Sequence, residues 1–196
     1  MRSAICVLFF LSCNTFAAGQ SLSKTSATGW YSETVSNGIV IQNSLPRGGP
    51  YPGPTNKNFN YTRLVFFTRV ANETKSTVEL TINFSADSVA IPGSPDTFVK
   101  LFTPPDTMTL EKRSVFNFGV KPLESFDNPT SFKKTIKPNE ECLFLVVAIF
   151  YQTSPIAQNQ PRGGNRAELV LKGQDLFYRM PPQIDLLPCG NIVFKK

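Results

Sequence analysis

The feature that most constrains the fold is the stretch RLVFFTRVANETKSTVELTINF, residues 63–84. Its second half, VELTINF, alternates strictly between apolar and polar side chains. Successive side chains of a β-strand point to opposite faces, so this pattern predicts a half-buried strand in an antiparallel sheet. The first half is apolar on both faces and is predicted to lie more centrally. The polar connection ANETKS has a length that joins antiparallel neighbours, which predicts a hairpin.

Further strand-like runs follow at regular spacing, and 16 Pro and 12 Gly interrupt the chain too often for long helices. The most apolar run, ECLFLVVAIFYQ, is hydrophobic on both faces and is predicted to be the central core strand. Many short strands between Pro and Gly turns predict a β-sandwich or barrel. We expect strands at 38–43, 63–70, 78–84, 97–102, 107–120 (one long or two short), 141–152, 166–180 (two runs split at Gly173) and 190–196, with a helical turn only near NPTSF at 128–132.

The pattern V-x-N-x-T-x-x-x-V-x-L-x-I-x-F at residues 70–84 is similar to one common in bacterial immunoglobulin-like domains. The chain also resembles small secreted proteins of Bacteroidota over most of its mature length. This resemblance implies an exported protein with an all-β fold, an antiparallel immunoglobulin-like β-sandwich with short turns and little helix. No functional motif comes with the resemblance, so it implies no activity.

The N-terminus has the composition of an export signal. Arg2 supplies a positive charge, an apolar run spans residues 4–12, and small residues follow at 15–19. The run is shorter than the roughly 20 residues that cross a bilayer. Cleavage after Gly19 leaves residues 20–196 as one secreted, periplasmic or outer-surface domain. Two alternatives are an uncleaved N-terminus and a bacterial lipobox, FLSC, in which Cys13 carries a lipid anchor. Association with a membrane is predicted only in this lipidated form.

The chain carries 20 Lys and Arg against 14 Asp and Glu, a formal net charge of +6. Loss of residues 1–19 removes only Arg2, which leaves 19 − 14 = +5. A basic exported protein favours anionic partners such as polysaccharides or lipid headgroups. The basic residues are scattered and are not interleaved with stacking aromatic residues, so nucleic acid is not predicted as a partner.

Two cysteines lie beyond the export signal, Cys142 and Cys189. In an oxidising compartment they can form one disulfide, which would stabilise the fold by roughly 4 kcal/mol in the chain-entropy model. The alternative is two buried free thiols, because Cys142 begins a very apolar run. Neither cysteine belongs to a CxxC motif, so neither a redox motif nor a zinc site is predicted.

The chain contains no histidine. This excludes Ser-His-Asp and Cys-His catalysis, HExxH metalloprotease chemistry and His-ligated zinc or copper within the chain. The motifs GxSxG, GxxxxGK[ST] and GxGxxG are also missing from the sequence. Paired carboxylates could still act on a glycan, but one sequence does not show which of the 14 acids would face each other. We predict no catalytic residue, no metal ligand and no cofactor.

Two predicted loops share the tetrapeptide Pro-Arg-Gly-Gly, in QNSLPRGGPYPGP (42–54) and QNQPRGGNR (158–166). A structural interpretation is that both are flexible glycine turns. A functional interpretation places Arg47 and Arg162 on loops at one end of the sandwich, where they meet an anionic ligand. Trp30 and Tyr51 are candidates for stacking on a sugar, although Trp30 could instead fix the first strand to the core.

These features predict a non-catalytic binding or structural module of the cell envelope, whose partner is a protein or an envelope glycan. The alternative is a small carboxylate-dependent glycan-active enzyme, and a third possibility is assembly through sheet edges or apolar faces. A deep cleft with two facing acids would favour the enzyme. A flat face with exposed aromatic residues would favour glycan binding.

Overall fold

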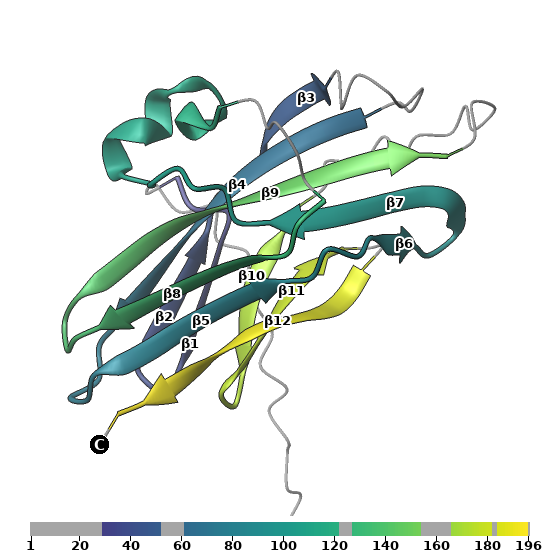
Figure 1. Ribbon diagram of the computed structural model, residues 1–196. Coiled ribbons are helices and arrows are strands. Elements are labelled where there is room, and N and C mark those ends of the chain that lie inside the picture. Colours follow the sequence, from purple (N-terminus) through teal and green to yellow (C-terminus); the bar gives the residue numbers. More distant parts are fainter. Residues whose placement is uncertain (1–28, 52–60, 122–126, 154–165, 182–183, 196) are drawn as a thin grey trace, which may run out of the picture.

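Two antiparallel sheets pack face to face in the computed structural model, which describes residues 29–51, 61–121, 127–153, 166–181 and 184–195 (Figure 1). Within these residues the remaining regular structure is two short 3₁₀ turns, and no α-helix is present. The all-β sandwich expected from the sequence is therefore confirmed. The export signal lies outside the described residues.

The larger sheet, sheet A, has the strand order β1–β2–β4–β9–β7–β6, and β3 also pairs with β4. The long strand β4 explains this branch, because β2 pairs with its second half and β3 with its first half. On its other side β4 pairs with β9 along almost its whole length. The strands of sheet A are β1 (Ser32–Ser36), β2 (Ile39–Asn43), β3 (Arg47–Tyr51), β4 (Tyr61–Asn72), β6 (Val89–Ile91), β7 (Ser94–Phe102) and β9 (Glu141–Gln152).

The smaller sheet, sheet B, has the strand order β10–β11–β12–β5–β8. The predicted division of residues 166–180 at Gly173 is confirmed, since β10 and β11 form a hairpin around it. The predicted helical turn near residues 128–132 is wrong, because Thr130 begins β8 and pairs with Phe84. The strands of sheet B are β5 (Val78–Phe84), β8 (Thr130–Ile136), β10 (Glu168–Lys172), β11 (Asp175–Met180) and β12 (Ile184–Phe194).

The predicted hairpin between residues 63–70 and 78–84 is also wrong, because β4 lies in sheet A and β5 in sheet B. Asn72 directs this crossing. Its side-chain amide donates to the backbone carbonyls of Ser76 (2.8 Å) and Ile136 (3.0 Å), and its carbonyl oxygen accepts the N–H of Thr74 (3.0 Å). Both strands were correctly predicted to be buried, but they cover one core from opposite sides.

Sheet A is apolar on both faces, as the two-sided runs of β4 and β9 predicted. Alternate residues of β9 face sheet B, among them Phe144 and Val146, and the residues between them, such as Leu145 and Val147, face outward. The inward residues belong to the main core between the sheets. The outward residues form a second, smaller core with these members: Trp30, Tyr61, Val65, Phe67, Phe102, Met108, Phe118, Val120, Leu145, Val147 and Ile149.

The second core is covered by residues 103–121, hereafter the covering segment, which follows β7. The strand or strands predicted at 107–120 are absent, and the segment forms two 3₁₀ turns instead, η1 (Leu110–Ser114) and η2 (Phe116–Gly119). Figure 1 shows both turns beside β3, on the side of sheet A away from sheet B. The apolar residues that suggested a strand serve to cover the outer face of sheet A.

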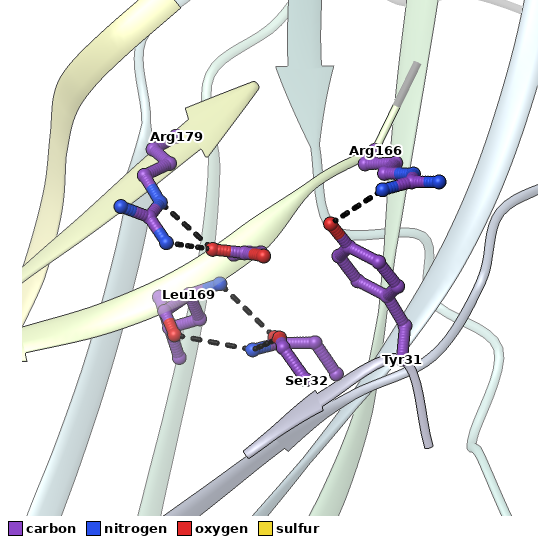
Figure 2. A network of polar contacts seen from close by, with 7 residues as sticks. Tyr31, Ser32, Arg166, Leu169 and Arg179 are labelled. Atoms are coloured by element: carbon purple, nitrogen blue, oxygen red, sulfur yellow. Dashed lines mark hydrogen bonds and ion pairs between the residues drawn. The ribbon is translucent and has the colours of Figure 1, made fainter. Parts of the chain in front are cut away.

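A polar connection joins the two sheets at Asn43, at the end of β2. Its side-chain amide donates to the carbonyl of Leu169 in β10 (3.2 Å), and its carbonyl oxygen accepts the Leu169 N–H (3.0 Å). Figure 2 shows Leu169 held through both of its backbone groups. The Asn43 side chain thus takes the place of a neighbouring strand for β10. Nearby, Arg179 donates to the largely buried carboxylate of Glu168 through Nε (2.7 Å) and Nη2.

Candidate anion-binding surface

The outer face of sheet A brings several arginines and aromatic rings together around the second core. The positions follow from the strand register. Arg47 of β3 lies opposite Val65 of β4, and Arg63 of β4 lies opposite Gly49 of β3. Val65 belongs to the second core, so both arginines project from the same outer face. Diagonal neighbours of this kind have Cβ atoms about 7 Å apart.

Each guanidinium is fixed by an aromatic ring and a backbone carbonyl. The Arg47 guanidinium carbon lies 4.6 Å from the centre of the Phe118 ring, and its Nη1 donates to the carbonyl of Val115 (3.0 Å). The Arg63 guanidinium lies 5.4 Å from the centre of the Tyr51 ring, and its Nη1 donates to the carbonyl of Lys121 (3.2 Å). Such contacts orient the planar fork and leave other N–H donors of each guanidinium with no hydrogen-bond partner among the described residues, so they can bind a ligand.

The charges of Arg47 and Arg63 are not neutralised by any carboxylate of the described chain. Elsewhere cations and acids are paired: Arg69 with Glu141 (Nε to Oε2, 2.7 Å), and Glu79 with two lysines. Since unpaired, partly ordered guanidinium groups attract carboxylate, sulfate or phosphate groups, this part of sheet A is suited to an anionic ligand.

The two glycines of the first Pro-Arg-Gly-Gly tetrapeptide have different roles. A Cβ atom at Gly48 would lie 1.9 Å from the backbone oxygen of Arg63, and its φ of +151° is rarely adopted by other residues. Gly48 is therefore required for the close pairing of β3 with β4. A Cβ atom at Gly49 would meet nothing within 4 Å. Gly49 thus leaves open space above the sheet, opposite Arg63 and between Arg47 and Tyr51.

The covering segment reaches the second core through a strained turn. Asn117 and Phe118 both have left-handed backbone angles (φ 49° and 55°), which is unusual for a bulky residue such as Phe118. The turn inserts Phe118 into the core, where its ring meets Phe67 edge-on at 4.9 Å. The cost of the strain, about 1–3 kcal/mol per residue, is offset by burial of this ring. The turn also places Phe118 beneath Arg47.

The residues predicted from the sequence are only partly brought together. Arg47 and Tyr51 lie on the same strand of the proposed surface, whereas Arg162 lies outside the described residues. Trp30 is buried against Phe67 (ring centres 5.1 Å apart), which supports the structural interpretation of this residue.

Two arginines that the sequence did not single out complete the surface. One is Arg63. The other is Arg113, whose guanidinium lies 5.0 Å from the centre of the Trp30 ring. The only signal in the sequence was that Arg63 interrupts an otherwise apolar run, at a position that shares its face with Tyr61, Val65 and Phe67.

A row of aromatic side chains crosses the same face at one end. Tyr51 pairs with Tyr61, Tyr61 with Tyr151, and Tyr151 with Phe98, so neighbouring rings come from β3, β4, β9 and β7. The rings of Tyr61 and Tyr151 lie 5.8 Å apart, and those of Phe98 and Tyr151 lie 5.6 Å apart and nearly parallel. Burial, with smaller effects of Tyr151 and Asp127, raises the pKa of the Tyr61 hydroxyl.

The predicted disulfide is not formed, because Cys142 and Cys189 are both free and buried. Cys142 lies in sheet A opposite Val70, near the connection from β4 to β5, whereas Cys189 precedes Gly190, which pairs with Ile82 well along β5. The two cysteines thus lie in different sheets and at different positions along the strands. A disulfide needs Cα atoms about 4.4–6.8 Å apart, which this arrangement does not provide. Burial raises the pKa of Cys142 to about 11 and that of Cys189 to about 12, so neither is a nucleophile at neutral pH.

A cleft of about 550 Å³ opens between the sheets at the end of β5. Its wall is mostly apolar and includes Phe84, Val89, Leu101 and Leu187, and Asp87 is the one carboxylate that the described residues contribute to it. Hydrolysis of a glycan by the usual mechanism needs two carboxylates about 5–9.5 Å apart, and the described part of the lining supplies one.

The described residues contain no group of three or more His, Cys, Asp or Glu side chains that could hold a metal ion. They also contain no helix with the length and apolar character needed to span a membrane. Comparisons of the chain with protein-family models, curated proteins and solved structures find no significant match. The geometry of the outer face of sheet A is therefore the main guide to function.

Proposed function

We propose that this protein is an exported, non-catalytic binding module of the cell envelope that binds an acidic glycan on the outer face of sheet A. The proposal is carried by one observation: Arg47 and Arg63 project from the same face, are fixed by aromatic rings and carbonyls, and have no carboxylate partner in the described chain.

The shape of this surface favours a polymer over a small molecule. The open space above Gly49 lies on a sheet face, and the acidic groups of a polyuronate or sulfated glycan repeat along the chain. Two guanidinium groups whose Cβ atoms are about 7 Å apart can engage such groups in succession. The Tyr51 ring at the edge of this space offers a sugar an apolar surface.

Export through residues 1–19, a lipid anchor at Cys13 as its alternative, and an immunoglobulin-like relationship belong to the same proposal. They are supported by the composition of the N-terminus and by the pattern at residues 70–84. A protein partner is the alternative ligand. A glycan-active enzyme is the alternative function. We prefer binding because Arg47 and Arg63 have a defined geometry, whereas the described lining of the cleft contains one acid.

The proposal is tested by affinity electrophoresis and calorimetry with polygalacturonate and with a neutral glucan. We expect the wild-type protein to bind the polyuronate, less tightly at high salt, and to bind the glucan weakly. Arg47→Gln or Arg63→Gln should each weaken binding about tenfold, the effect of losing one charge-assisted hydrogen bond. Arg63→Lys, which keeps the charge but loses the planar fork, should also weaken it.

Lys172→Gln is the matched control, because Lys172 is an exposed cation at the end of β10 with no ion pair in the described chain. It removes the same charge and should change the affinity less than about twofold. Equal losses in Lys172→Gln and Arg63→Gln would indicate non-specific attraction to a basic protein. A wild-type protein with no affinity for acidic glycans would refute the proposal.

A further inference from the structure

The covering segment exposes apolar side chains to solvent at one place. Phe116 is the most exposed large apolar residue of the described chain, with 78% of its surface accessible. Val115, its neighbour, and Leu110, in the preceding turn, are each 45% exposed. We call these three residues the apolar tip. Exposure of a phenylalanine to this extent is costly in water and needs an explanation.

The exposure of Phe116 is built into the backbone. The left-handed backbone at Asn117 and Phe118 directs the Phe118 ring into the second core and leaves the Phe116 ring exposed. Arg47 fixes this arrangement, because it donates to the Val115 carbonyl (3.0 Å) and stacks on the Phe118 ring. The apolar tip is therefore held against sheet A and presents Phe116 to the surroundings.

The covering segment is basic, and Arg47 of β3 binds it at the apolar tip. Lys112 and Arg113 come from η1 and Lys121 ends the covering segment, while Arg47 and Arg63 both donate to its backbone. The acids of the segment are Asp106 and Glu111. Residues 103–121 thus carry three cations against two acids, a charge of 3 − 2 = +1, and Arg47 of β3, which donates to the Val115 carbonyl, adds a further cation beside the exposed ring.

We propose that the covering segment docks on an anionic lipid bilayer, with Phe116 in the interfacial region and these cations against the headgroups. Aromatic residues and cations together are the combination that binds membrane surfaces. A specific protein interface usually buries about 800 Å² on each partner. The three exposed apolar side chains of the tip offer a small contact by that measure, which favours shallow insertion into a bilayer over a protein interface.

This docking would be independent of a lipid at Cys13, and it does not rest on glycan binding by Arg47 and Arg63. Both points decide how it is tested. The full chain is used in a Cys13→Ser background, so that no acyl group can be attached there. Co-sedimentation is measured with vesicles of phosphatidylcholine alone and of phosphatidylcholine mixed with phosphatidylglycerol. Every variant retains the same N-terminus, so its contribution cancels in the comparison between variants.

We expect binding to the anionic vesicles, weaker binding to the neutral ones, and a decrease with salt. Phe116→Ser should lower the affinity for anionic vesicles about tenfold or more, since burial of most of the ring is lost. Val193→Ser is the matched control, because Val193 is an exposed apolar residue (43%) on β12 of sheet B. It should bind as the parent does. Polygalacturonate binding should be unchanged in Phe116→Ser, which separates this inference from the proposed function.

A second variant places a reporter in the tip. Trp30 is buried, so a change in the emission of a Phe116→Trp variant on addition of vesicles, compared with the parent, reports mainly on the new position. The emission should shift to shorter wavelength with anionic vesicles and be quenched by brominated lipid. Equal vesicle binding by Phe116→Ser and its parent, or no blue shift in Phe116→Trp, would overturn the inference. Self-association of the parent that is lost in Phe116→Ser, without vesicle binding, would overturn it in favour of a protein contact.

Discussion

Removal of the Asn43 side-chain amide should show how strongly the two sheets depend on one polar residue. Asn43 is 2% exposed and makes both hydrogen bonds with Leu169, and its carbonyl oxygen also accepts the hydroxyl of Thr68 (3.1 Å). In Asn43→Ala the N–H and the carbonyl of Leu169 lose their partners in the interior, while Thr68 keeps its contact with Tyr178. A buried polar group left without a partner costs about 1–3 kcal/mol, so we expect a loss of about 2–6 kcal/mol.

The Asn43→Asp variant tests the same contacts through pH. A protonated aspartic acid can still donate to the Leu169 carbonyl, but a carboxylate cannot, and burial disfavours its charge. The pKa of the introduced group should therefore be higher in the folded protein than its unfolded value of about 3.9. The free energy of unfolding of Asn43→Asp, relative to wild type, is therefore highest below about pH 4. It decreases by about 1.4 kcal/mol per pH unit as the pH rises toward the pKa of the group in the folded protein.

Urea unfolding followed by tryptophan fluorescence measures both effects, because Trp30 is buried in the second core. Asn83→Ala is the control: Asn83 is an exposed asparagine on β5, and its replacement should change the free energy of unfolding by less than about 0.5 kcal/mol. The reasoning is wrong if Asn43→Ala costs less than about 1 kcal/mol. It is also wrong if the deficit of Asn43→Asp is the same at low and neutral pH.

Three further predictions concern other parts of the fold. Gly48→Ala should destabilise the protein by more than about 1 kcal/mol, because the new Cβ would meet the Arg63 carbonyl, and Gly49→Ala, with open space around it, should be nearly neutral by urea unfolding. Cys142 and Cys189 should resist alkylation in the native protein at neutral pH and react fully once it is unfolded without reductant; a disulfide-linked peptide pair in the mass spectrum would contradict this. Glu79 should titrate below 4.5 by NMR, because hydrogen bonds from two lysines lower its pKa. Its contribution to stability is therefore present above its unfolded pKa and is lost as pH falls through the folded pKa. A titration midpoint at or above 4.5 would show that these contacts do not persist in solution.

The sequence predicted individual strands better than their assignment to sheets. Alternation in VELTINF identified the buried face of β5, and two-sided apolar runs identified the centre of sheet A. Periodicity states which face is buried but not which sheet buries it, so the connection from β4 to β5 was mistaken for a hairpin turn. The crossing is fixed by hydrogen bonds of the Asn72 side chain, which are local with Thr74 and Ser76 and tertiary with Ile136 of β8, and the tertiary contact cannot be read from the sequence.

The candidate site was harder to predict than the fold for a similar reason. Arg47 stood out through the Pro-Arg-Gly-Gly tetrapeptide and Tyr51 as an aromatic residue that can stack on a sugar, but Arg63 had the sequence context of an ordinary cation in a strand. Only the register, which sets Arg63 opposite Gly49, places it beside Arg47. The covering segment was predicted to be a strand because its apolar residues are spaced as in a strand. The sequence Asn-Phe-Gly at 117–119, where the backbone makes its left-handed turn, was the signal against a strand that was missed.

The long ladder between β4 and β9 has a consequence for how the chain reaches this state. Its partners, such as Tyr61 and Tyr151, are far apart in sequence, and the rest of sheet A is built on either side of the pair. In a nascent chain that lacks residues 141–152, β4 can pair with β2 and β3 along one edge, but its other edge has no partner and its two apolar faces are not covered. Sheet A can therefore be completed only late in synthesis. Fragments that end before residue 141 should aggregate rather than form a smaller stable domain.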